Sequence, residues 1–135
     1  MTTHYPEPVA RLVTLGATDA HEATDYHKLG FGPQHIPDLI RLVEDMELRS
    51  LPWDDDETPP PEVYAQIHAW RVLGQLGALE AIPALLGLLH LIDDAQDDFV
   101  DEEVPVMLGK LGATAIQPCR DYLVDRTKGN YARIA

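Results

Sequence analysis

The chain has 135 residues, 45% of them apolar, which is enough to form the core of a single domain and excludes wholesale disorder. Ten Lys and Arg stand against 23 Asp and Glu, and the formal net charge of −13 argues against nucleic acid or an anionic membrane surface as a partner. The longest apolar stretch, residues 81–92, is shorter than the roughly 20 residues of a membrane span. With one cysteine and no apolar leader, we expect a cytoplasmic protein.

Residues 1–50 predict an irregular N-terminal unit of short helices. Apolar side chains recur at helical spacing over residues 9–13, and Asp19 with Glu22 forms a capping box for a further helix that ends near Gly30. A clear amphipathic helix follows. Its apolar positions are Ile36, Leu39, Ile40, Val43 and Met46.

Residues 51–61 predict an acidic, proline-rich loop, and residues 62–96 predict a helix pair. The first helix has an apolar stripe and ends at Gly77, a candidate left-handed cap. The stripe consists of Val63, Tyr64, Ile67, Trp70, Leu73 and Leu76. The second helix, about residues 79–91, is apolar almost all round, which predicts that it is buried between neighbours.

Residues 97–130 predict a second helix pair, and residues 131–135 begin a further one. Asp97 or Asp98 is the expected N-cap of the first helix. Pro105 lies inside this helix, at a cost of about 3 kcal/mol unless packing compensates. The second helix ends near Asp125 and contains Cys119, which we expect to be a buried structural residue.

The two pairs repeat each other in sequence. The pattern Leu-Gly-x-Leu-Gly occurs at residues 73–77 and again 35 residues later, and Ile82 recurs as Ile116 after 34 residues. The start of the first helix, Tyr64, recurs as Phe99 and then as Tyr131. Self-similarity at this period is typical of stacked repeats. The sequence therefore predicts an all-α fold, a right-handed α-α solenoid of helix pairs.

These features resemble bacterial HEAT-like repeats of the short type first associated with phycobilisome lyase subunits. The resemblance rests on the Leu-Gly-x-Leu-Gly element, on Ile-Pro or Ile-Gln-Pro at the start of the second helix, on Asp97-Asp98-Phe99-Val100 and on Pro105. A group of bacterial HEAT-repeat proteins of unassigned function is also similar, on residues 68–76 together with Asp25-Tyr26 and His35-Ile36-Pro37. The resemblance to short HEAT-like repeats covers residues 61–135 well and residues 25–49 in part.

The resemblance also offers two enzyme classes, and the residues fit neither. Di-iron hydroxylases with HEAT-like repeats use several His-Glu dyads, whereas this chain has one, His21-Glu22. DNA glycosylases of this architecture need a basic concave surface, whereas residues 93–103 hold seven acids and no base. We therefore expect no catalytic, cofactor-binding or metal-binding residues.

The sequence favours a non-enzymatic protein-interaction or scaffold module. The alternative that the resemblance implies is an accessory subunit of a modifying enzyme, such as a chromophore-lyase-like complex. The net charge favours a protein partner with a basic surface. The apolar side chains of residues 131–135, which begin a helix pair, indicate either a longer repeat protein or self-association through the C-terminal end.

The candidate partner-binding residues are Trp53, His68, Trp70 and Arg71. His68 and Arg71 lie on one edge of the Trp70 helix, where they either line a concave face or make internal hydrogen bonds. Trp53 either covers the core between units or contacts a partner.

Overall fold

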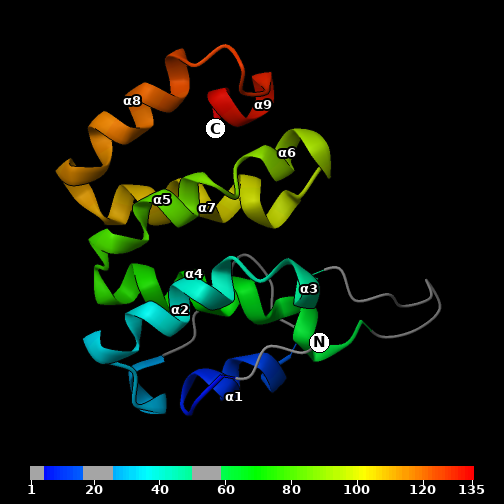
Figure 1. The fold of residues 1–135 in the computed structure, drawn as a ribbon, viewed down its shortest axis with the longest axis vertical. Helices are drawn as coiled ribbons and strands as arrows, with labels where there is room; N and C mark the ends of the chain where they lie inside the picture. Colours follow the sequence, from blue (N-terminus) through cyan, green and yellow to red (C-terminus); the bar gives the residue numbers. More distant parts are fainter. Residues whose placement is uncertain (1–4, 17–25, 50–58) are drawn as a thin grey trace.

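A computed structural model describes residues 5–16, 26–49 and 59–135, and all regular structure in these ranges is helical (Figure 1). The α-helices are α1 (Val9–Thr14), α2 (Ile36–Val43), α3 (Met46–Arg49), α4 (Ala65–Leu76), α5 (Ile82–Leu86), α6 (His90–Asp94), α7 (Asp98–Lys110), α8 (Ile116–Val124) and α9 (Asn130–Ile134). Short 3₁₀ helices are η1 (Tyr26–Leu29), η2 (Pro33–His35), η3 (Pro61–Tyr64), η4 (Leu79–Ala81) and η5 (Gly112–Ala115). The all-α prediction is confirmed for these residues, and no helix among them is long and apolar enough to cross a bilayer.

Local signals set the ends of the main helices. Gly77 ends α4 with a φ of 65°, the left-handed conformation that glycine adopts without strain. Asp97 caps α7, because its Oδ1 accepts a hydrogen bond from the Val100 N–H at 3.0 Å. The helix α7 continues through Pro105. The predicted cap residues and helix positions are thus confirmed here.

Two predicted helices are interrupted in the structure. The helix predicted over residues 79–91 is divided into η4, α5 and α6, and the His90 imidazole Nδ1 donates to the Gly87 carbonyl at 2.8 Å. The helix predicted to include Met46 ends at Val43, and the Asp45 carboxylate then accepts from the Leu48 N–H at 3.3 Å to start α3. In both places a side chain takes a backbone hydrogen bond that a continuous helix would make.

The helices stack in series from α1 at one end of the molecule to α8 and α9 at the other (Figure 1). Helix α4 packs against α1, α2 and α7, while α5 contacts both α2 and α8. Tyr64 and Phe99, equivalent in the two repeats, meet edge to face with ring centroids 6.5 Å apart.

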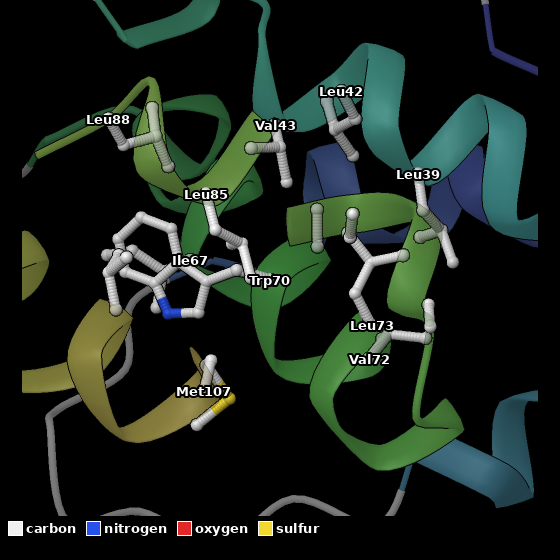
Figure 2. Packing of buried hydrophobic residues seen from close by; sticks show 14 of the residues in the cluster. Leu39, Leu42, Val43, Ile67, Trp70, Val72, Leu73, Leu85, Leu88 and Met107 are labelled. Carbon is white, nitrogen blue, oxygen red and sulfur yellow. The ribbon is translucent and has the colours of Figure 1, made fainter. Parts of the chain in front are cut away.

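The core lies between these stacked helices. Trp70 of α4 is its largest fully buried side chain. Figure 2 shows this residue near Leu85 of α5 and Met107 of α7. The capping box predicted at Asp19 and Glu22 lies outside the described residues.

Candidate binding cleft

Three of the four predicted partner-binding residues are buried within the described part of the chain. His68 and Arg71 are 2% and 7% exposed, and Trp70 is fully buried. Of the two alternatives for His68 and Arg71, the structure shows the internal hydrogen bonds, and neither side chain lines an exposed face. Trp53 lies outside the described residues.

Arg71 joins the two repeats through a buried ion pair. Its Nε and Nη2 atoms donate to Oε1 and Oε2 of Glu103 at 2.7 and 2.8 Å, and the Trp70 indole donates to Oε1 at 3.1 Å. Burial alone would lower the pKa of Arg71, but its hydrogen bonds with Glu103 and Tyr26 hold that pKa above the ordinary value. The pair thus connects α4 to α7.

His68 continues this network toward the N-terminal unit. Its Nε2 donates to the Gly16 carbonyl oxygen at 2.9 Å, and in the neutral imidazole Nδ1 then accepts from the Tyr26 hydroxyl at 2.8 Å. No buried side-chain nitrogen or oxygen of the described residues lacks a hydrogen-bond partner. We therefore assign these residues to stability rather than to a binding surface.

An apolar cleft of about 590 Å³ lies at the other end of the molecule, between α5, α7, α8 and α9. Apolar side chains of these helices line most of the cleft. Two lining positions, Gly109 and Gly112, carry no side chain and so leave space in it. The lining residues with large apolar side chains are Leu86, Leu89, Leu108, Ile116, Tyr122, Leu123 and Ile134. This volume is in the range of clefts that hold drug-sized ligands.

The cleft exists because the second repeat is left uncovered where the first is covered. Ile82 in α5 is 4% exposed, whereas the equivalent Ile116 in α8 is 52% exposed. Leu89 is 5% exposed, whereas the equivalent Leu123 is 50% exposed. The apolar stripe of α8 therefore continues the pattern of a buried helix without the neighbour that would bury it.

The charged residues of the cleft are basic. Arg120 and Arg133 line it, and no acid does. Residues 110–133 hold five of the ten Lys and Arg and only two of the 23 acids, so this segment differs in sign from the chain as a whole. Arg120 is exposed and forms no ion pair with the described residues. The cleft thus combines an apolar lining with one exposed guanidinium, that of Arg120, and a second, that of Arg133, whose Nε is bonded to a backbone carbonyl.

Cys119 also lines the cleft, where it occupies the position that Leu85 holds in the first repeat. Its side chain is partly buried, which corrects the expectation of a buried residue. Burial raises the pKa of the Cys119 thiol, so the thiolate is disfavoured at neutral pH. Burial, with the nearby Asp93, also raises the pKa of Tyr122, which stays a neutral phenol.

One wall of the cleft, α9, is fixed by a carboxylate from α6. Oδ1 and Oδ2 of Asp93 accept from the N–H groups of Tyr131 and Ala132 at 3.1 and 2.9 Å. Gly129 precedes the helix, and a Cβ at this position would overlap the Asp93 carboxylate. Arg133 Nε donates to the Leu123 carbonyl at 2.7 Å, which joins α9 to α8.

The sequence predictions did not single out Arg120, Arg133, Ile116 or Leu123 as site residues. A usable signal was present in the repeat alignment. Arg120 stands where the first repeat has Leu86, and a cation at a position that is apolar in the preceding repeat indicates a changed environment.

The described residues contain no group of three or more His, Cys, Asp or Glu side chains placed to hold a metal ion. Comparison of the chain with models of known protein families, with curated proteins and with solved structures gives no match. The HEAT-like resemblance stays a prediction.

Proposed function

We propose that the protein is a non-enzymatic interaction module that binds a protein partner through the cleft end. One observation carries this proposal, namely the exposed apolar side chains that surround the cleft, including Leu123 at 50% and Ile134 at 81% exposure. Contiguous exposed apolar surface on a folded protein is typical of a binding site. The lining offers a single thiol with a raised pKa, which favours binding over covalent chemistry.

We also propose that the architecture is the right-handed α-α solenoid of HEAT-like pairs expected from the sequence. The serial contacts support this arrangement, since α4 packs against α7 and α5 against α8. In such stacks each repeat contacts only its neighbours, and an uncovered repeat presents an extended surface. We propose, too, that the protein is located in the cytoplasm.

A second surface favours a basic partner, as the net charge predicts. Exposed carboxylates gather along the α6–α7 connection and the first turns of α7, at Asp94, Asp98, Asp101 and Glu102. This acidic edge attracts a partner of opposite charge and repels nucleic acid.

The test compares capture of partners by two surface variants. Leu123→Glu places a charge in the cleft, while Leu79→Glu places one at a half-exposed apolar position that does not line it. Proteins crosslinked in the cell of origin are quantified by mass spectrometry after circular dichroism confirms that both variants are folded. We expect partners retained by the wild type and Leu79→Glu to be lost from Leu123→Glu, and equal capture by all three would refute the proposal.

A further inference from the structure

We infer that the cleft binds one face of an amphipathic helix that carries carboxylates beside its apolar side chains, supplied by another protein. This inference rests on the proposed function and names the chemistry of the partner. It is carried by the way the first repeat is covered, by the empty space at Gly109 and by the charge of the lining.

The contact of α7 with α4 shows what kind of helix covers this face of a repeat. Three α7 residues at a spacing of four meet α4 or the end of η3 just before it: Phe99 lies against Tyr64 of η3, Glu103 pairs with Arg71, and Met107 lies near Gly74. Residues at this spacing share one face of a helix. The covering face is therefore apolar at both ends and acidic in the middle.

The equivalent place in the second repeat is open. A Cβ at Gly74 would lie 2.5 Å from the Met107 sulfur, whereas a Cβ at the equivalent Gly109 would meet no atom within 4 Å. Helix α9, of five residues, borders the cleft beside this space. The space that α7 occupies on the first repeat is thus available to a helix on the second.

The charge of the cleft lining favours a helix with negatively charged side chains. Arg120 and Arg133 face the cleft without an acid among the lining residues, although the whole chain has a formal net charge of −13. The position equivalent to Arg71 is Val106, so the cation that the incoming helix would meet comes from α8 instead: a carboxylate at the edge of its apolar face could pair with Arg120, and a lysine there would be repelled. Apolar and acidic side chains together complement this surface better than apolar side chains alone.

The test uses three labelled synthetic helices of 18 residues with the same apolar positions and with Glu, Gln or Lys beside them. Binding is measured by fluorescence anisotropy at low ionic strength, where charge effects are largest. We expect the Glu helix to bind at least about tenfold more tightly than the Gln helix, and the Lys helix to bind most weakly.

Two charge-reversal variants test whether the preference for the Glu helix arises in the cleft. Arg120→Glu should reverse the order of the Glu and Lys helices, whereas Arg126→Glu, the same change at an exposed residue outside the cleft, should leave it unchanged. Cys119 is the one cysteine of the chain, so its rate of alkylation reports on the cleft directly. A saturating Glu helix should slow this rate at least about fivefold.

Three outcomes overturn the inference. Equal affinities of the three helices, or an order that Arg120→Glu does not change, exclude charge selection in the cleft. Protection of Cys119 by dodecanoate but by none of the helices identifies a site for a small apolar acid instead. A dimer in sedimentation analysis that Ile134→Glu abolishes, without helix binding, identifies an interface between copies.

Failure of this inference and failure of the proposed function are distinguishable. If Leu123→Glu loses its crosslinked partners while no helix binds, the interaction function stands and the acidic helix is excluded. If Leu123→Glu keeps its partners, the function assigned to this surface is wrong whatever the peptides do.

Discussion

The two repeats share one sequence pattern, yet their equivalent residues lie in different surroundings. In the first repeat α5 is packed between α2 and α8, whereas in the second repeat α8 contacts α5 and the short α9, and the cleft lies between these helices and α7. Ile82 and Ile116 therefore differ in burial although they hold the same register. In stacked helices, the burial of a residue therefore depends on the next unit along the stack as well as on its own register.

The substitutions between the repeats follow this difference. Leu85 and Leu86 in the first repeat are replaced by Cys119 and Arg120 in the second, where the side chains reach the cleft. An arginine at the covered position would have to be paired or solvated. The second repeat therefore tolerates polar side chains at positions that are apolar in the first. Cys119 and Arg120 supply the thiol and one of the guanidinium groups of the cleft.

The largest expected effect on stability comes from removing the Glu103 carboxylate, which holds α7 against α4 in the first repeat. Glu103→Ala leaves Arg71 buried without its carboxylate and removes the acceptor of the Trp70 indole. We expect the free energy of unfolding to fall by about 3–5 kcal/mol, measured by urea denaturation.

The neighbouring Glu102 provides the matched control, because it is exposed on the same helix. Glu102→Ala should change the free energy of unfolding by less than about 0.5 kcal/mol. A loss at Glu103 as small as the loss at Glu102 would mean that the ion pair does not hold α7 on α4.

The next effect compares equivalent isoleucines directly. Ile82→Ala removes a buried side chain and should cost about 2–5 kcal/mol of unfolding free energy. Ile116→Ala, at the same register of the half-exposed α8, should cost less than about 1 kcal/mol. Similar losses in thermal denaturation would show that Ile116 is covered in solution, for instance by a second copy.

Local rules in the sequence predicted much of the fold. The helical period of the apolar residues, the cap at Asp97 and the end of α4 at Gly77 all depend on neighbours within a few positions. The breaks after Val43 and Leu86 were missed, because the side chains of Asp45 and His90 take over backbone hydrogen bonds there.

The site was harder to predict because its features are not local. Arg71 appears in the sequence as an isolated base on a helix edge, and its partner Glu103 lies 32 residues away within a run of acids. Their pairing buries a residue that was predicted to bind a partner. Conversely, the stripe of α8 has the pattern of a core helix, and its exposure depends on which segment lies next to it.

A smaller effect concerns the N-terminal caps of α7 and α9, the helices that begin the second repeat and the next one. Asp97 caps α7 from within its own segment, whereas Asp93 caps α9 from α6, and the equivalent amides of Val100 and Ala132 are bonded at 3.0 and 2.9 Å. Asp93→Ala should raise the hydrogen-exchange rates of the Tyr131 and Ala132 amides by about 2- to 30-fold, the equivalent of about 0.5–2 kcal/mol.

The exposed neighbour Asp94 is the control, since Asp94→Ala removes the same charge without a hydrogen bond to α9. The Val100 amide serves as an internal reference in both variants. Unchanged protection of Ala132 in Asp93→Ala would show that the wall of the cleft is held by packing alone.

The smallest expected effect is a difference in thiol reactivity at one register of the two repeats. Burial raises the pKa of Cys119, so at neutral pH the thiolate fraction is below that of a free cysteine. Alkylation by iodoacetamide, followed by mass spectrometry over about pH 7–10, should start more slowly and keep rising above the pH at which free cysteine levels off. Leu85→Cys in a Cys119→Ala background places a thiol at the equivalent position, which is 0% exposed, and should react more slowly still because it needs local opening. Equal rates at the two positions would mean that the cleft is closed in solution or that the first repeat opens as readily as the second.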